Sequence, residues 1–220
     1  KGVHGVWPVP VDAVIGQIQV TLADIGADVI KTGMLGSAAL VEAIAECLAE
    51  AVSMAPRVID PVMVATSGDR LVDARAVEAI RSELVPRARL VTPNAPEAEV
   101  LTGKAVETVD GQRRAAERLL ELGAHGALVK GGHIGGKTIT DVLQTTTGEW
   151  IFESPRIVTM STHGTGCTLA SAIAAHLAQG ASVPDAVERG RDYLIGAIRS
   201  AKPFGKGHGP VNHGWVLDSE

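Results

Sequence analysis

The strongest constraint on the fold is the alternation of short apolar segments with helical segments. The segments RVIDP (57–61), RLVTPN (89–94) and GALVKGG (126–132) are short, largely apolar, and end at proline or glycine. Between them, residues 73–84 and 110–122 show helical patterns. Because strands that alternate with helices form a mostly parallel sheet covered on both faces, the pattern predicts an α/β fold.

The rest of the chain continues this order. Ser37 is expected to cap one further helix, which carries apolar side chains on one face. Other helices are expected at 12–25 and 183–200, a strand at 28–32, and a hairpin at 138–144 and 149–153. No repeat, low-complexity tract or linker divides the 220 residues, so we expect a single domain.

The side chains with chemical potential follow the expected strands. They are Met34, Asp60, Asn94, Lys130 and the turn at 162–167. In open α/β sheets, ligands bind beyond the carboxyl ends of the strands. We therefore expect these separate segments to meet at one edge of the sheet and to form the functional site there.

The stretch STHGTGC (161–167) places two glycines directly before an apolar helical run. The first N–H groups of a helix lack internal partners, and glycine lets the backbone approach a ligand closely. Together with the helix dipole, this predicts an anion site at Gly164 and Gly166. It is not a P-loop, because no Gly-Lys-Ser/Thr follows, and it lacks the third glycine of the dinucleotide fingerprint.

Cys167 stands where that turn becomes a helix, and two interpretations remain open. The field of the helix start favours a thiolate, which would make Cys167 reactive. Alternatively, Cys167 is a small buried apolar residue behind a tight turn. The other cysteine, Cys47, lies near the apolar face of a helix and is expected in the core.

Composition excludes several classes of function. The net charge is −5 and no Lys/Arg cluster occurs, so we expect neither nucleic acid nor a membrane as partner. With only two cysteines, a disulfide framework is not expected, and a reducing cytoplasm fits better. Aromatic residues make up 3% of the chain, so the core must be built from Val, Ile, Leu and Ala.

Six motifs carry a resemblance to a known family. They are KTGML (31–35), DPVMVATSGD (60–69), LVTPNAPEAEVLTG (90–103), VKGGH (129–133), STHGTGCTLASAIAAHLA (161–178) and GKGHGPVNH (205–213). In this order and at these spacings, the chain resembles the hydroxymethylpyrimidine/phosphomethylpyrimidine kinases, members of the ribokinase-like superfamily with a three-layer αβα sandwich. Related sugar kinases usually carry Asp where Cys167 stands, so the cysteine indicates the pyrimidine branch.

The resemblance implies ATP-dependent phosphoryl transfer to a pyrimidine hydroxymethyl group and to its monophosphate. The implied catalytic residues are Gly164, Thr165, Gly166, Cys167 and Lys130. The anion site would hold the transferring phosphate, Cys167 would act as base beside the acceptor hydroxyl, and Lys130 would offset charge on ATP.

The resemblance also implies binding residues. ATP would contact Thr92, Asn94, Lys130, Gly131, His133, Thr162 and Gly164; the pyrimidine would contact Met34, Val62 and Cys167; and Asp60 and Glu97 would hold Mg²⁺. The residue types fit, since Mg²⁺ takes few protein carboxylates. Without the resemblance, Asp60 is explained equally well as a capping residue, and Glu97 is explained better as an acidic residue in a helical first turn. Asn94 could cap that helix, contact Mg²⁺ through water, or do both.

The chain departs from the family pattern in two places. The family commonly has Lys at the position of Thr66, in a segment expected to form a mobile flap. In the family, N-terminal strands and a glycine-rich substrate loop precede the segment that matches residues 1–9. We expect those strands and that loop to be missing from this sequence. The resemblance further implies a homodimer.

Two alternatives to a pyrimidine kinase stay open. A pyridoxal/pyridoxine kinase has the same fold and a similar substrate ring. A non-catalytic nucleotide-binding fragment is favoured by the missing front and disfavoured by the intact Asp60, Lys130 and Gly-Thr-Gly-Cys turn.

Overall fold

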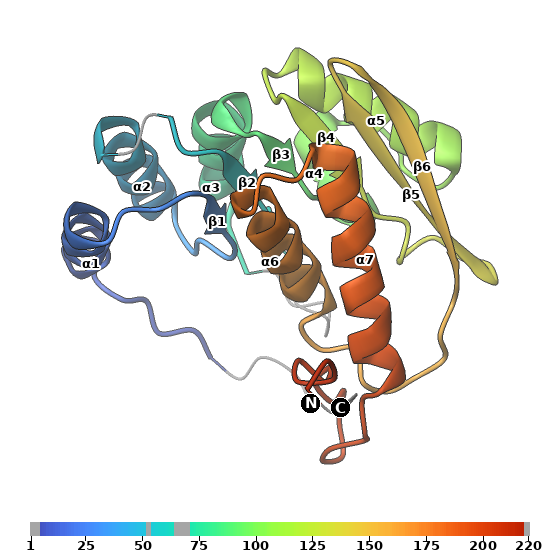
Figure 1. Ribbon diagram of the computed structural model, residues 1–220. Helices are drawn as coiled ribbons and strands as arrows, with labels where there is room; N and C mark the ends of the chain where they lie inside the picture. The colour runs from blue at the N-terminus through green and yellow to red at the C-terminus, as the bar shows by residue number, and fades with distance from the viewer. Residues whose placement is uncertain (1–4, 52–53, 64–70, 218–220) are drawn as a thin grey trace.

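The computed structural model describes residues 5–51, 54–63 and 71–217. Its centre is a six-stranded sheet with helices on both faces (Figure 1). The strands lie in the order β1 (Ile30–Thr32), β2 (Arg57–Ile59), β3 (Leu90–Val91), β4 (Gly126–Val129), β5 (Thr138–Thr145) and β6 (Gly148–Pro155). Neighbours from β1 to β4 pair parallel, whereas β5 and β6 pair antiparallel as the expected hairpin.

The helices begin and end close to the positions that the sequence predicts. They are α1 (Val11–Asp24), α2 (Ala38–Ala51), α3 (Ala74–Ala79), α4 (Ala95–Thr102), α5 (Val109–Glu121), α6 (Thr165–Ala178) and α7 (Val183–Arg199). The expected helix at 73–84 is only partly α-helical, because a π-helical turn at Ile80–Leu84 follows α3. None of the described helices is long and apolar enough to cross a bilayer.

Side-chain alternation along the strands builds two cores. On β4, Leu128 packs with α6 and α7, while the next residue, Val129, packs with α2 to α5. Successive side chains on a strand point to opposite faces, so a fully apolar strand such as β4 supplies both layers. Figure 1 shows α6 and α7 on one side of the sheet and α3, α4 and α5 on the other. This three-layer arrangement fixes the start of α6 against the carboxyl edge of the sheet.

Helix α1 is attached differently from the others. It packs against α2 and buries none of its 14 residues. Val20 on α1 and Ile25 just after it are 66% and 81% exposed. The core therefore lies between the sheet, α2 to α5 and the α6–α7 pair, and α1 adds little to it.

Candidate active site

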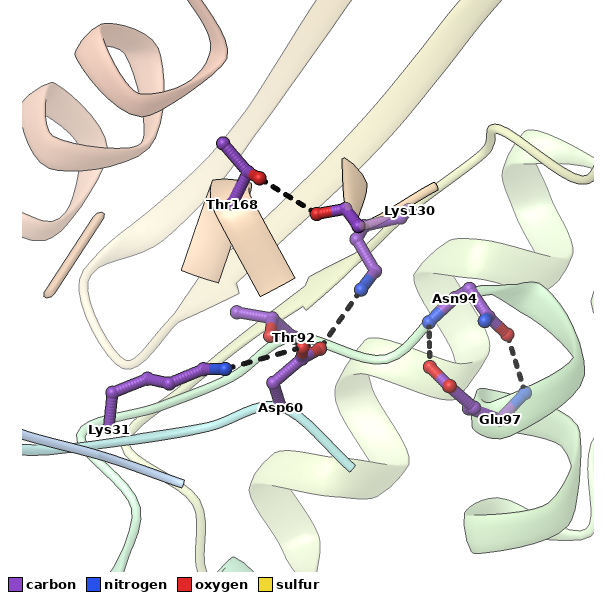
Figure 2. A network of polar contacts seen from close by, with 8 residues as sticks. Lys31, Asp60, Thr92, Asn94, Glu97, Lys130 and Thr168 are labelled. Atoms are coloured by element: carbon purple, nitrogen blue, oxygen red, sulfur yellow. Dashed lines mark hydrogen bonds and ion pairs between the residues drawn. The ribbon is translucent and has the colours of Figure 1, made fainter. Parts of the chain in front are cut away.

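The carboxyl ends of the parallel strands bring Asp60, Thr92 and Lys130 together, as the sequence predicts. Backbone hydrogen bonds to the neighbouring segments align these three residues along the sheet edge. Asp60 N donates to Thr32 O, Thr92 N to Ile59 O, and Lys130 N to Pro93 O, at 2.9–3.1 Å. The three side chains converge at one edge of the sheet (Figure 2).

Asp60 is the centre of this group, and only 1% of its side chain is exposed. Its Oδ1 accepts hydrogen bonds from Thr92 Oγ1 and from Lys130 Nζ, both at 3.1 Å. Its Oδ2 is buried, makes no hydrogen bond to the described residues, and lies 3.9 Å from Lys31 Nζ. One carboxylate oxygen is therefore saturated, while the other keeps lone pairs for a ligand.

The electrostatics keep Lys130 charged. Burial alone would lower the pKa of Lys130, but the charges of Asp60 and Glu97 outweigh it, so this pKa is raised. The pKa of the Glu97 carboxyl is also raised, but here burial is the cause, and it outweighs the lowering effect of Lys130. Lys130 therefore stays protonated, and the neighbouring Glu97 carboxyl binds a proton more readily than an ordinary glutamate does.

Asn94 and Glu97 form the beginning of α4. Glu97 N donates to Asn94 Oδ1 at 2.9 Å, and Asn94 N donates to Glu97 Oε2 at 2.8 Å, which makes a reciprocal capping box. The structural explanations of both residues are therefore correct, and they do not exclude ligand binding. Glu97 is only 4% exposed, with Asp60 and Lys130 close enough to influence its pKa.

The glycine turn delivers the start of α6 to the same place. Gly164 precedes the helix with φ of 83°, a left-handed conformation that favours glycine. A methyl group added at Gly166 would lie 3.4 Å from Lys130 Nζ and 4.0 Å from Asp60 Oδ2. Thr168 N donates to Gly164 O, so the N–H groups of residues 165–167 come before the first helical hydrogen bond. Unsatisfied amides, an ammonium group and a carboxylate thus meet around one small space.

The two cysteines differ in exposure, and this decides between the two interpretations of Cys167. Cys47 is buried in the core, as expected, whereas Cys167 is exposed in the first turn of α6. The alternative that Cys167 is a buried apolar residue is wrong, because α6 turns this position away from its packed face.

The other predicted contact residues lie on the segments that follow β1, β2 and β4 and on the glycine turn. Met34 follows β1 and is 40% exposed, and Val62 is half-buried two residues after Asp60. Thr162 Oγ1 lies 3.1 Å from His208 Nδ1, which ties the turn to the C-terminal loop. Gly131 is buried directly after Lys130, and His133 is exposed in the following loop. Most of the expected flap, with Thr66, lies outside the described residues.

Sequence reasoning missed three groups that support or extend the site. In the sequence Lys31 is only one residue of the motif KTGML, yet its ammonium group faces Asp60. Asp141 on β5 accepts a hydrogen bond from Gly131 N at 2.7 Å and pairs with the buried Arg191 of α7. The available signal was an isolated acidic residue within the apolar strand TDVL, whose partner is 50 residues away.

A third missed group is Arg156, which clamps the loop after Lys130. Its guanidinium donates to the carbonyl oxygens of Gly132, Ile134 and Gly136 at 2.5–2.9 Å. A cavity of about 250 Å³ lies beside this loop and the start of α4, lined partly by His133 and Gly135. A cavity of about 480 Å³ lies at the opposite edge of the sheet, around Arg57, and takes no part in the predicted site.

Comparison with known proteins places the chain among vitamin-related kinases. The profile of the phosphomethylpyrimidine kinase family matches residues 1–212. The hydroxymethylpyrimidine/phosphomethylpyrimidine kinase of Streptomyces coelicolor is 47% identical over 217 residues, which cover 99% of this chain and 80% of that protein.

Two solved structures are similar over most of the chain. An ADP complex of Bacillus subtilis pyridoxal kinase superimposes with a TM-score of 0.89 at 32% identity, covering 98% of this chain and 80% of that one. A phosphomethylpyrimidine kinase from Clostridium difficile 630 gives a TM-score of 0.78 at 33% identity, covering 90% and 82%.

Proposed function

This chain belongs to the phosphomethylpyrimidine kinase family, and we propose that it transfers the terminal phosphoryl group of ATP at the site around Asp60, Lys130 and Gly166. The family and ribokinase-like fold predictions are confirmed. The chain is a kinase that phosphorylates hydroxymethylpyrimidine and its monophosphate in thiamine biosynthesis.

The position of Gly166 supports the proposed site most directly. Phosphoryl transfer requires charge neutralisation and in-line positioning more than covalent chemistry. The open amides at the start of α6 and the ammonium of Lys130 face the same space, since a Gly166 methyl would lie 3.4 Å from Lys130 Nζ. This space suits a phosphoryl group, whose charge would be held by backbone amides and one lysine.

Cys167 is the proposed base for the first phosphorylation. It is exposed beside the open amides, next to Gly166 in the same helical turn. A thiolate there would accept the proton of the hydroxymethyl group as its oxygen attacks the terminal phosphorus of ATP. ADP would then leave, and the pyrimidine monophosphate would remain.

The carboxylates fit a magnesium ion. Asp60 Oδ2 is buried without a hydrogen bond to the described residues, and Glu97 lies close enough to Asp60 to sense its charge. Mg²⁺ binds few protein carboxylates and keeps waters and phosphate oxygens as its other ligands. Asp60 and Glu97 would hold the ion, which when bound would neutralise charge on the ATP phosphates.

The remaining predicted contacts divide into two groups. We propose that Met34 and Val62 form apolar walls for the pyrimidine. The ATP side would use Thr92, Asn94, Gly131, His133 and Thr162 with the open amides. Support comes from the sheet order, which puts β1 and β4 on opposite sides of β2 and β3.

The organisation of the protein is also a proposal. We propose one kinase domain that assembles as a homodimer in the cytoplasm. Both cysteines, Cys47 and Cys167, are free, which fits a reducing compartment. Light scattering of the full natural chain measures the oligomeric state, and a monomer at micromolar concentration would contradict the dimer.

Release of ADP with each acceptor tests the activity. The full natural chain should turn over hydroxymethylpyrimidine and its monophosphate with ATP and Mg²⁺. The likeness to pyridoxal kinase supports a second candidate substrate, so pyridoxine is assayed in parallel. A higher kcat/KM on pyridoxine would replace the pyrimidine assignment, and nucleotide binding without turnover of any acceptor would support a non-catalytic domain.

A further inference from the structure

Lys31 holds an ammonium group at the site that the preceding mechanism does not use. It is the middle residue of β1 and pairs with Val58 of β2. Its Nζ lies 3.9 Å from Asp60 Oδ2, and its side chain is 19% exposed. This separation is too long for a hydrogen bond, and Lys31 Nζ makes none to any described residue. Besides its ion pair with Asp60, this largely buried ammonium group therefore has donors free for a further anionic partner.

Lys31 and Lys130 approach Asp60 from opposite sides of the sheet edge (Figure 2). Lys31 comes from β1, one strand to one side of β2, whereas Lys130 follows β4, two strands to the other side. Lys130 lies beside the loop held by Arg156 and near Asn94, with which it forms a β-bridge. The two ammonium groups therefore serve two different regions of the site.

The charge balance leaves room for a second anion. Two ammonium groups surround the single carboxylate of Asp60. The open amides at the start of α6 add further positive potential. Each ammonium group can therefore contact an anionic oxygen of its own, one on either side of Asp60.

The region around Lys31 is the acceptor side. Met34, a proposed wall of the pyrimidine pocket, is three residues beyond Lys31 and is 40% exposed. The two acceptors of this kinase differ by one phosphate group, so a site that accepts both needs a cation for the second. Lys130 cannot supply it alone, because it is bonded to Asp60 and faces the nucleotide side.

We propose that Lys31 binds the phosphate of the pyrimidine monophosphate and so selects for the second phosphorylation. The inference rests on the proposed function. In this step an oxygen of the acceptor phosphate bonds to the terminal phosphorus of ATP, the bond from that phosphorus to the bridging oxygen breaks, and ADP leaves. A charge-assisted contact of this kind contributes about tenfold to a hundredfold in kcat/KM.

The test compares Lys31→Met with Lys31→Arg and with Lys104→Met. Met keeps most of the side-chain length without the charge, Arg keeps the charge, and Lys104 is exposed at the far end of α4. ADP release is measured with the alcohol and with the monophosphate. The readout is the ratio of kcat/KM for the monophosphate to kcat/KM for the alcohol, which cancels any general loss at Asp60.

In Lys31→Met the ratio should fall about tenfold or more, mainly through a higher KM for the monophosphate. Lys31→Arg should keep most of the ratio, and Lys104→Met should match the parent enzyme. An unchanged ratio in Lys31→Met would overturn the proposal, since Lys31 would then only hold Asp60 in place. A ratio equally low in the Arg and Met variants would also overturn it.

A measurement on the unmutated enzyme keeps the proposal testable if Lys31→Met does not fold. The KM for the monophosphate should rise with ionic strength more steeply than the KM for the alcohol, because salt screens the partly exposed ammonium. Equal salt dependence would overturn the proposal. An enzyme that turns over neither acceptor would instead refute the proposed function, so the two failures are distinguishable.

Discussion

Replacing Gly166 with alanine should stabilise the protein while abolishing most of its activity. Gly166 lies in the first turn of α6, with a backbone that an L-residue adopts without strain. Alanine at such a helical position typically adds about 0.5–1 kcal/mol, because the unfolded chain loses freedom. For a chain of this size, that corresponds to about 1–4 °C in Tm.

The added methyl group occupies the space that the account assigns to the phosphoryl group. It would lie 3.4 Å from Lys130 Nζ and 4.0 Å from Asp60 Oδ2, which are ordinary contact distances. The folded protein therefore accommodates it, but a phosphate oxygen cannot share the position. Losing one such anion contact typically costs about a hundredfold to a thousandfold in kcat.

A matched control is Gly16→Ala on α1, where no atom lies within 4 Å of the added methyl group. Scanning calorimetry and ADP release are measured on both variants. Gly16→Ala should gain similar stability with parental turnover, whereas Gly166→Ala should gain stability and lose turnover. Parental activity in a stable Gly166→Ala enzyme would show that the space next to Lys130 is not used for the phosphoryl group.

Two further changes probe the base and the buried carboxyl. Cys167→Ala should lower kcat/KM for the alcohol by about 10²–10⁴. The loss should be smaller for the monophosphate, because its phosphate is largely a dianion at neutral pH and needs no base. Equal losses in the two ADP-release assays would contradict the role of Cys167 as base. Because the folded-state pKa of Glu97 is raised, its contribution to stability is full at low pH and is lost as pH rises through that pKa. Glu97→Gln should therefore flatten the pH dependence of the urea midpoint and raise stability at neutral pH. The control is Glu107→Gln at an exposed position. An unaltered pH profile in Glu97→Gln would contradict the raised pKa of Glu97.

The side chains at the sheet edge can be predicted from the sequence, because each is indicated by the residues next to it in the chain. Each strand is a short apolar run, and the residue that follows it, such as Asp60 or Lys130, must emerge at the edge where parallel strands end. The glycine turn before α6 is equally local. These local features therefore suffice to predict that Asp60, Lys130 and the glycine turn meet at one edge of the sheet.

The missed features depend on partners far apart in the chain. The buried ion pair of Asp141 and Arg191 joins β5 to α7, and no spacing rule connects them. In the sequence, Lys31 is indistinguishable from a solvent-facing lysine on a short strand. Only the fold brings Asp60 beside it. Gly131 shows no pattern either, yet a methyl group there would lie 2.0 Å from Thr140 O, so the close approach of β5 requires glycine.

The most direct test of the account is a crystal structure of the full natural chain with Mg²⁺, a non-hydrolysable ATP analogue and the pyrimidine alcohol. The terminal phosphate should lie within about 2.7–3.2 Å of the amides of Gly166 and Cys167. Lys130 Nζ should contact the same phosphate, with the acceptor hydroxyl beside Cys167. A terminal phosphate placed away from the start of α6, with these amides bound to water, would contradict it.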